Sequence, residues 1–320
     1  MTRTGAGDSD EREITLAGLM SGGAAKPTGR LPVSVIVPTI GRTELLRQCL
    51  ESLAACRPGA EEIVIVDQSD AREVYALAER FADAGARRVR CDGRGTSRAM
   101  NRGLREVSHD RVLVTHDDCT VNADWVEAAE RLLGTESDLI VTGRVMPVGE
   151  PASVPSIKVD PVSHDFTGER QCGALYPNNM ALSREGVLAL GGFDERIRYA
   201  EDNDLCYRWL RAGHRLRYHP ELVVWHHDWR SRPDLTRLYR RYWHSQGVFY
   251  AKHLRGGDLA VLRFIADDAR AALRLAGARL VRGRPAWPDP RSGIPLALPA
   301  GLIAGLRVDW KARPEAPQWL

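Results

Sequence analysis

The chain has 320 residues, enough for one large domain with additions or for two domains. Hydrophobic residues make up 43% of it and charged residues 27%, as is usual for soluble globular proteins. The formal net charge of +3 is too small to indicate nucleic-acid binding, so we expect no nucleic-acid partner.

Residues 1–30 are rich in glycine, serine and charged side chains, and we predict a disordered leader there. This stretch lacks the apolar core of a signal peptide. The longest apolar run, 294–306, is shorter than the roughly 20 residues that a membrane-spanning helix needs and contains prolines. We therefore expect a cytoplasmic protein.

Residues 31–115 alternate between short apolar runs and amphipathic segments. We predict buried strands at 31–38, 62–67, 88–91 and 111–115, with helices at 43–53, 71–84 and 95–107 between them. This order is typical of an α/β fold with a mixed, mostly parallel sheet flanked by helices. No G-x-G-x-x-G motif or P-loop follows the first strand, which argues against a Rossmann dinucleotide site or a P-loop site.

The rest of the chain continues this pattern less regularly. We predict strands at 139–145, 178–182, 215–218 and 222–225, and helices at 123–133, 183–190, 201–212, 235–254 and 258–281. Residues 147–170 contain four prolines and little periodicity, so we predict a long loop. The predicted organisation is an α/β domain over 31–230, with halves 31–145 and 146–230, followed by a helical extension over 231–320.

The extension is basic. From Arg270 to Leu320, nine arginines and lysines stand against three acids, a local charge of about +6. Two interpretations stay open: peripheral contact with an anionic membrane surface, or a helix packed on the domain with its arginines in solvent.

The six cysteines are scattered, without a C-x-x-C pair, and most fall in apolar segments. Their distribution predicts reduced, mostly buried thiols and argues against a disulfide framework or a zinc site.

The fourth predicted strand runs directly into His116, Asp117 and Asp118. Open α/β sheets bind ligands beyond the carboxyl ends of their strands. Carboxylates and imidazole are suited to Mg²⁺ or Mn²⁺ carrying substrate phosphates. The alternative is a polar turn with an aspartate helix cap.

Two other strand ends are predicted to face the same crevice. Pro38, Thr39 and Arg42 follow the first strand, and Asp67 ends the second. An acid there can accept a hydrogen bond from a nucleobase or ribose, and backbone amides can meet phosphate. The alternatives are a solvated charge for Arg42 and a turn-forming role for Asp67.

Three further positions are candidates. Arg98 and Asn101 lie near a glycine-rich helix start, which favours anions, although Arg98 is also a plausible surface residue. Glu201 and Asp202 open another helix, where the helix dipole alone also favours acids. His226, beside His227 and two tryptophans, is either a ligand or a structural histidine.

Seven segments in one order resemble the family-2-type inverting nucleotide-sugar glycosyltransferases of the GT-A fold. They are VSVIVPTIGRTELLRQCLESL, IVIVDQSD, GRGTSRAMNRGL, LVTHDDCTVNADWVE, NNMALSREGVLALGGFDE, AEDNDLCYRWLRAG and VVWHHDWR. Together they span roughly residues 33–229. Each segment alone is a weak signal, whereas seven in the family's order are specific.

The resemblance implies a metal-dependent glycosyltransferase that moves a sugar from a nucleotide diphosphate sugar to an acceptor hydroxyl with inversion. Residues 31–145 would form the nucleotide-sugar-binding half and 146–230 the acceptor half. The implied donor-binding residues are Pro38, Thr39, Arg42, Asp67, Arg98, Asn101 and Asp117. The implied ligands of Mn²⁺ or Mg²⁺ are Asp118, His116 and His226. His116 departs from the family's D-x-D motif, which has an acid in that position.

In the family the aspartate of the E-D pair is the general base, which implies this role for Asp202. Glu201 would contact the acceptor or raise the pKa of the base. Asp194 is a further candidate for acceptor binding, and Trp225 is a candidate for stacking on a sugar ring.

The sequence leaves the sugar, the nucleotide, the acceptor and the oligomeric state open. The resemblance fits synthesis of a cell-surface glycan, a glycolipid or a glycosylated metabolite. The acceptor would be a glycan, a lipid-linked molecule or a small molecule, and a lipid-linked one would fit peripheral contact at the inner membrane face.

Two other interpretations of the site stay open. A non-catalytic relative that binds a sugar nucleotide would explain His116. A nucleotidyltransferase would carry a glycine-rich loop with Arg and Lys after the first strand, where PTIGRTELL has one glycine and one arginine.

Overall fold

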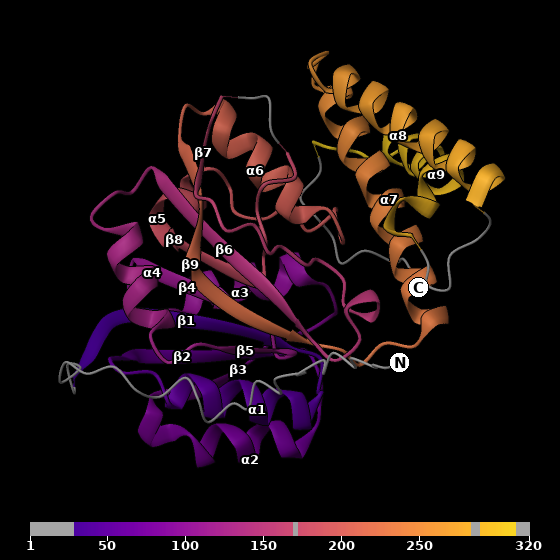
Figure 1. Ribbon diagram of the computed structural model, residues 1–320. Coiled ribbons are helices and arrows are strands. Elements are labelled where there is room, and N and C mark those ends of the chain that lie inside the picture. The colour runs from indigo at the N-terminus through magenta and orange to yellow at the C-terminus, as the bar shows by residue number, and fades with distance from the viewer. Residues whose placement is uncertain (1–28, 169–171, 283–288, 312–320) are drawn as a thin grey trace, which may run out of the picture.

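The computed structural model describes residues 29–168, 172–282 and 289–311 (Figure 1). The leader predicted for residues 1–30 therefore lies almost wholly outside the described residues. So do the side chains of several basic residues near the C-terminus, namely Arg279, Arg282, Arg284 and Arg313.

The first part of the chain alternates strands and helices as predicted. Its elements are β1 (Arg30–Thr39), α1 (Thr43–Ala54), β2 (Gly59–Asp67), α2 (Arg72–Arg80), β3 (Ala86–Arg90), α3 (Thr96–Glu106) and β4 (Arg111–Thr115). The helix predicted for 71–84 is shorter than expected, because a separate 3₁₀ turn (Ala82–Ala84) follows α2.

The second part mixes strand directions. Its elements are β5 (Cys119–Val121), α4 (Trp125–Leu133), β6 (Leu139–Val148), β7 (His164–Thr167), β8 (Asn179–Ser183), α5 (Arg184–Ala189), α6 (Glu201–Arg211) and β9 (Arg215–His227). Three further α-helices follow within the described residues: α7 (Arg232–Arg255), α8 (Val261–Arg282) and α9 (Ile294–Leu306).

All the strands join one sheet, in the order β3-β2-β1-β4-β8-β6-β9-β5, with β7 also paired to β9. β1, β2, β3, β4, β6 and β9 run in one direction, and β5, β7 and β8 run in the other. The predicted α/β class with a mixed, mostly parallel sheet is confirmed.

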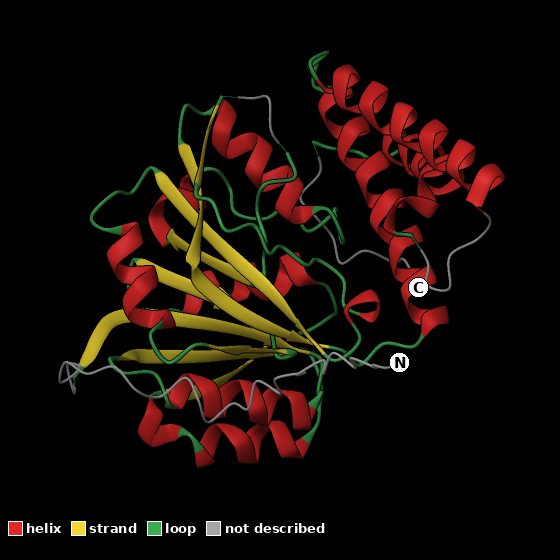
Figure 2. Cartoon of the chain, viewed as in Figure 1, coloured by secondary structure: helices red, strands yellow, loops and turns green. Residues whose placement is uncertain are grey.

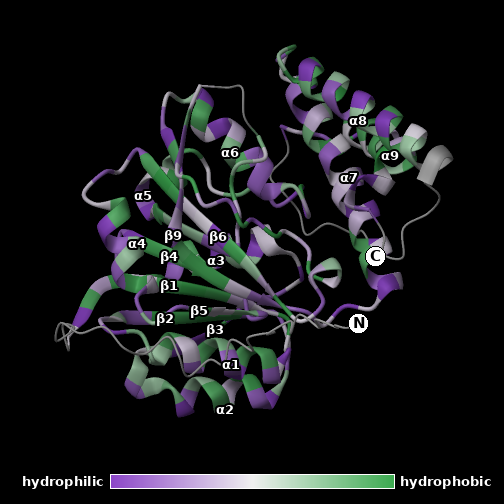
Figure 3. Ribbon diagram, in the orientation of Figure 1, coloured by the Kyte–Doolittle hydropathy of each residue, from purple (hydrophilic) through white to green (hydrophobic). Residues whose placement is uncertain are grey.

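Helices cover both faces of this sheet (Figure 2). Along β1, Val35 and Val37 pack with residues of α1, α2 and α4, whereas Ile36 between them packs with residues of α3, α5 and α6. Because neighbouring side chains of a strand point to opposite faces, a strand buried on both faces must be apolar throughout. The central strands are accordingly largely hydrophobic in the hydropathy view (Figure 3).

The helices α7, α8 and α9 form a bundle beside the α/β core (Figure 1). A separate apolar cluster joins this bundle to α6, and its members include Tyr207 of α6, Phe249 of α7, Val261 of α8 and Leu298 of α9. α7 and α9 approach closely because each presents glycines to the backbone of the other helix. These are Gly247 of α7 and Gly301 and Gly305 of α9. The basic extension is thus helical, as predicted, and is packed on α6.

Two predictions from hydrophobic periodicity were wrong. The strands predicted at 215–218 and 222–225 form one strand, β9, whose pairing with β6 shifts between Gly143 and Arg144. The side chain of Asn179 donates hydrogen bonds to the carbonyls of Arg144 (2.9 Å) and Leu222 (2.8 Å) at this irregularity. A distant residue therefore supplies the hydrogen bonds that let the strand continue.

The loop predicted for 147–170 also contains structure. β6 extends to Val148, and β7 pairs with the start of β9. β7 has the sequence His-Asp-Phe-Thr, which offers no apolar alternation, and Asp165 makes an ion pair with Arg217 of β9 (2.6 Å). Cross-strand charge pairing of this kind leaves no periodic signal in the sequence.

Among the described residues, no helix has the length and apolar character needed to cross a membrane. The six cysteines lie outside any disulfide in the described structure, and all except Cys172 are buried, which confirms the predicted burial of most thiols.

Alanine substitutions at two glycines test whether the close packing of α7 against α9 stabilises the bundle. A Cβ at Gly301 would collide with the backbone of His244 in α7, so we expect Gly301→Ala to lower the free energy of unfolding by about 1–3 kcal/mol. A methyl group at Gly277 of α8 would have no neighbouring atom within 4 Å, so Gly277→Ala should be neutral or stabilising. Denaturant unfolding of both variants checks this, and equal effects would contradict the close α7–α9 packing.

Candidate active site

The carboxyl ends of β1, β2, β4 and β9 meet at one edge of the sheet and bring most of the predicted site residues together. Thr39 and Asp67 are register partners at the ends of β1 and β2. Residues 116–118 follow β4, and His226 lies near the end of β9, opposite Cys119 of β5. The predicted clustering at this edge follows directly from the parallel directions of these strands.

Asp117 fixes the junction between β1 and α1. Its carboxylate accepts a hydrogen bond from Thr39 Oγ1 (2.7 Å) and makes a two-point contact with the guanidinium of Arg42, whose Nε lies 3.2 Å away. Asp117 is fully buried, and burial raises its pKa although Arg42 opposes this. Both oxygens are therefore engaged in orienting Thr39 and Arg42.

Asp118 lies among nitrogen atoms from two distant parts of the chain, Arg42 after β1 and residues 226–230 at the end of β9. One oxygen, Oδ2, accepts from Arg42 Nη1 (2.9 Å) and Trp229 Nε1 (2.8 Å), with Arg230 Nη2 at 3.4 Å and His226 Nε2 at 3.5 Å. Burial alone would raise the pKa of this carboxyl, but His226, Arg42 and Arg230 outweigh burial and hold it well below its usual value. Asp118 is thus ionised at neutral pH.

The indole of Trp229 lies between two guanidiniums. Arg42 is 4.5 Å from the ring centroid and Arg230 is 4.1 Å from it. Cations stack favourably on an indole face, so these contacts hold both arginines over the Asp118 carboxylate. Arg230 was missed in the sequence, although a basic residue three positions after a strand that ends in two histidines is a signal that could have found it.

Several buried nitrogen atoms around Asp118 have no hydrogen-bond partner among the described residues. They are both ring nitrogens of His226, Nε2 of His116 and Nη1 of Arg230. Buried polar atoms are nearly always paired in native proteins, so unpaired ones grouped around a carboxylate indicate a place for a bound ligand.

Asp118, Cys119 and His226 form a group of potential metal ligands, with one ligand atom from each within 4.8 Å of the others. The carboxylate and the unpaired imidazole suit Mn²⁺ or Mg²⁺, whereas burial raises the pKa of the Cys119 thiol far above neutral. The residues therefore fit a divalent cation held by Asp118 and His226. His116 is not part of this group, and burial lowers its pKa to about 4.

Three other predicted donor-binding residues form hydrogen bonds or an ion pair with other residues of the chain. Asp67 accepts hydrogen bonds from the backbone N–H and hydroxyl of Ser69 (2.8 and 2.7 Å) and from Arg88 Nε (2.8 Å). Asp67 therefore also has the turn-forming role that the sequence left open as the alternative. The Asn101 carboxamide exchanges two hydrogen bonds with the backbone of Phe193 (2.8 and 2.9 Å). Arg98 makes an ion pair with Glu195 (3.2 Å).

The first turn of α6 places two acids side by side, Glu201 and Asp202. Burial and the neighbouring Asp202 raise the pKa of Glu201 far above its usual value, and its Oε2 has no hydrogen-bond partner among the described residues. Burial also raises the pKa of Asp202, to about 6, although the backbone N–H of Asn203 donates to its Oδ1 (2.8 Å). A carboxylate with a pKa near 6 is a competent base at neutral pH.

The two residues predicted to bind an acceptor lie in different environments. Asp194 is held by Arg196 (2.8 Å) and Lys252 (2.9 Å). The indole of Trp225 donates to Asn122 Oδ1 (2.8 Å) beside β5. Their role in acceptor binding stays a prediction.

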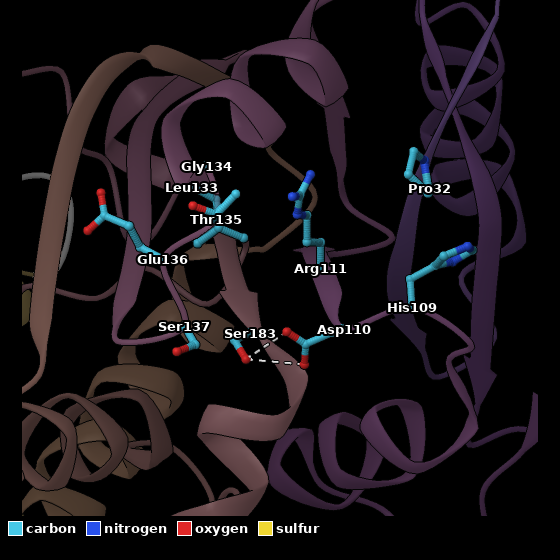
Figure 4. Close-up of a pocket in the computed structure, with 10 residues that line it drawn as sticks. All are labelled: Pro32, His109, Asp110, Arg111, Leu133, Gly134, Thr135, Glu136, Ser137 and Ser183. Carbon is cyan, nitrogen blue, oxygen red and sulfur yellow. Dashed lines mark hydrogen bonds between the residues drawn. The ribbon is translucent and has the colours of Figure 1, made fainter.

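A surface cavity of about 370 Å³ lies at the opposite edge of the sheet, near the amino ends of β1 and β4 (Figure 4). Asp110 in this cavity accepts hydrogen bonds from Ser183 Oγ (2.9 Å) and from the backbone N–H of Glu185 (2.8 Å) at the start of α5. This cavity contains none of the predicted site residues, and its acid caps a helix.

Residues 30–243 match the model of a family described as glycosyltransferase like family 2. The chain belongs to this family. The match covers the whole sheet and the first half of α7.

Curated relatives carry related names. A "Pre-mycofactocin glycosyltransferase" of Mycobacterium tuberculosis is 28% identical over 291 residues, which cover 85% of this chain and 55% of that protein. A "Glucosyl-dolichyl phosphate glucuronosyltransferase" of Haloferax volcanii is 25% identical over 67% of this chain and 75% of that protein. The chain thus spans about half the length of the mycobacterial relatives that it matches.

Solved structures share the fold. The mannosyltransferase PcManGT of Pyrobaculum calidifontis, in complex with GDP-Man and Mn²⁺, has a TM-score of 0.58 at 21% identity, covering 91% of this chain and 90% of that one. Residues 1–349 of S. aureus TarS, in complex with UDP-GlcNAc, give a TM-score of 0.54 at 17% identity, covering 69% of this chain and 66% of that one. The fold is therefore the GT-A fold.

Trp229 offers an optical test of the site. A nucleoside diphosphate that binds beside Asp118 would draw Arg42 and Arg230 away from the indole, so titration with UDP or GDP plus Mg²⁺ should change the tryptophan emission. We expect Trp229→Phe to lose most of this change. Trp310→Phe, which removes an indole near the end of α9, should retain it. A full signal in Trp229→Phe would contradict the placement of the ligand.

Proposed function

We propose that this protein is a metal-dependent inverting glycosyltransferase that moves a sugar from a nucleotide diphosphate sugar to an acceptor hydroxyl. The observation that carries the proposal is the cluster at Asp118, where an ionised carboxylate, two arginines and unpaired buried imidazole nitrogens meet beyond the strand ends. Family membership supports glycosyl transfer as the class of reaction, and this cluster fits the diphosphate of a donor.

The donor diphosphate would lie between Arg42 and Arg230, because guanidiniums bind phosphate oxygens at two points. Asp118 and His226 would hold a divalent cation. When bound, that cation neutralises charge on the leaving nucleoside diphosphate. Pro38, Thr39, Asp67 and Asp117 would shape the nucleotide end of the site.

Asp202 would act as the general base. Its carboxylate takes the proton of the acceptor hydroxyl, and the oxygen attacks the anomeric carbon from the face opposite the diphosphate. The new C–O bond forms as the bond to the phosphate oxygen breaks, which inverts the anomeric centre. Glu201 would lie beside the base in its protonated form, because burial and Asp202 raise its pKa far above the usual value, and it would contact the acceptor.

Tyr242 of α7 links the two halves of the proposed site. Its pKa is raised by burial and by Asp202 and Glu201, while Arg230 opposes this. The Tyr242 ring also meets the ring of Tyr199, which precedes α6, with centroids 6.0 Å apart. This contact joins α7, which follows Arg230, to the segment that carries the proposed base, and supports one reaction centre.

The relatives guide the choice of substrates. Solved neighbours hold GDP-Man with Mn²⁺ and UDP-GlcNAc, and curated relatives are named for a mycofactocin precursor and a dolichyl phosphate glucoside. We therefore propose a UDP- or GDP-linked donor and a lipid-linked or small-molecule acceptor. Exposed arginines on α8, such as Arg270 and Arg274, suit peripheral contact with an anionic membrane from the cytoplasmic side.

A donor panel tests the proposal. UDP-glucose, UDP-GlcNAc, UDP-glucuronate and GDP-mannose are each incubated with the wild type in Mn²⁺, Mg²⁺ or EDTA, and released nucleoside diphosphate is measured. We expect release from one donor, abolished by EDTA and reduced at least 100-fold in Asp202→Asn, because the amide cannot accept the proton. Asp165→Asn, on the exposed edge strand β7, is the matched control and should behave as the wild type.

The pH dependence follows from the raised pKa of Asp202. The base must be ionised, so kcat should be constant above about pH 6 and should fall roughly tenfold per pH unit below it. Folded protein that releases no nucleotide from any donor, or release that is unaffected by EDTA and by Asp202→Asn, would contradict the proposal.

A further inference from the structure

The junction between α6 and α7 contains a buried charge network that the proposed chemistry does not use. Lys252 of α7 bridges two carboxylates, Asp194 before α6 (2.9 Å) and Asp204 within α6 (2.6 Å). Only 17% of the Lys252 side chain is exposed, and the Asp204 side chain is fully buried. We name the set Asp194, Asn203, Asp204, Gln246, Lys252 and His253 the α6–α7 clamp.

Asp204 is the centre of the clamp. Besides Lys252, it binds Arg208 Nε (2.8 Å) and His253 Nε2 (3.1 Å). These positive neighbours overcome the effect of burial and lower the pKa of Asp204 far below its usual value. The side chain is therefore a fixed anion on which α7 is anchored.

A neutral hydrogen bond adds a second link. Asn203 Nδ2 donates to Gln246 Oε1 of α7 (2.7 Å), and Gln246 is buried. The rings of Tyr199 and Tyr242 also meet across the same junction, with centroids 6.0 Å apart. Residues directly before and after Glu201 and Asp202 are thus tied to α7.

Stability alone is a weak reason for such a network. Burying ions costs free energy, and well-packed apolar side chains often stabilise a protein equally well. A salt-bridge network instead fixes geometry, because each partner accepts only a narrow range of positions. Asp204 lies two residues after Asp202 in the same helical turn, so any shift of Asp204 moves the proposed base.

We propose that Lys252 is a positioning residue for the reaction: it binds Asp194 and Asp204 together and thereby holds the first turn of α6 where Asp202 meets the acceptor. The helical extension then belongs to the catalytic unit, because α7 sets the position of the base. This inference rests on the proposed role of Asp202 as the base.

The test compares variants of the full chain. Lys252→Met keeps an unbranched side chain of nearly the same length and removes its charge. Lys252→Arg keeps the charge, and Gln246→Met removes the link to Asn203. Arg237→Met, which removes an exposed ion pair on the same helix, is the matched control. For each variant, kcat and donor KM are measured with the donor that the wild type turns over fastest in the panel above, together with the melting temperature.

Misplacement of a reacting group by about 1 Å costs up to about 100-fold in rate, so we expect Lys252→Met to lower kcat roughly 10- to 100-fold. Donor KM should stay within about twofold, because the donor contacts lie on other elements. Gln246→Met should lower kcat less than Lys252→Met does. Lys252→Arg should retain most of the wild-type kcat. A purely structural clamp would lower the melting temperature and leave the kcat of the folded protein unchanged, which would overturn the inference.

Amide hydrogen exchange tests the positioning role of Lys252 independently of the proposed glycosyltransferase function. If the wild type turns over no donor, the proposed function fails and exchange alone decides about the clamp. We expect the amides of residues 200–206 to exchange at least tenfold faster in Lys252→Met and to be unchanged in Arg237→Met. Unchanged exchange of this segment in Lys252→Met would overturn the inference, whatever the activity.

Discussion

A buried carboxylate must be compensated, and the architecture of the site follows from how Asp118 meets this requirement. An ionised group removed from water is costly unless charged or hydrogen-bonding partners surround it. Arg42 comes from the β1–α1 junction, whereas Trp229 and Arg230 come from the β9–α7 junction. These contacts join the segment after β4, which carries Asp118, to two distant segments at the same edge of the sheet.

The two acidic groups of the site have opposite electrostatic surroundings. Positive neighbours hold the pKa of Asp118 low, whereas burial without positive neighbours raises the pKa of Asp202 and Glu201. Environments that separate the pKa values of nearby groups allow one to remain a charged ligand and another to exchange a proton. In the proposed mechanism, the same residue type would therefore serve both as a ligand at the diphosphate-binding centre and as the base.

The sequence alone predicted the features that depend on local pattern. The buried strands β1, β2 and β4 and the polar residues that follow them were visible, because apolar runs end abruptly at residues such as Asp67 and His116. Parallel strand ends necessarily share one edge, so the clustering of these residues could also be foreseen.

The remaining features depend on contacts between distant segments. The side chain of Asn179 donates to the carbonyls of Arg144 and Leu222 at the irregularity between β6 and β9, and Asn101 engages the backbone of Phe193. The clamp between Lys252 and Asp204 joins residues 48 positions apart. No local pattern in the sequence indicates such pairs, so the way the helical extension joins α6 could be found only in three dimensions.

The central claim is that Asp118 and its neighbours form a metal–diphosphate site, and calorimetric titration tests it most directly. UDP and GDP are titrated into the wild type and into Asp118→Asn, with Mn²⁺ or with EDTA. We predict Mn²⁺-dependent binding of one nucleotide, weakened at least tenfold by Asp118→Asn. Tight binding that is equal in both proteins, or equal with and without Mn²⁺, would contradict it.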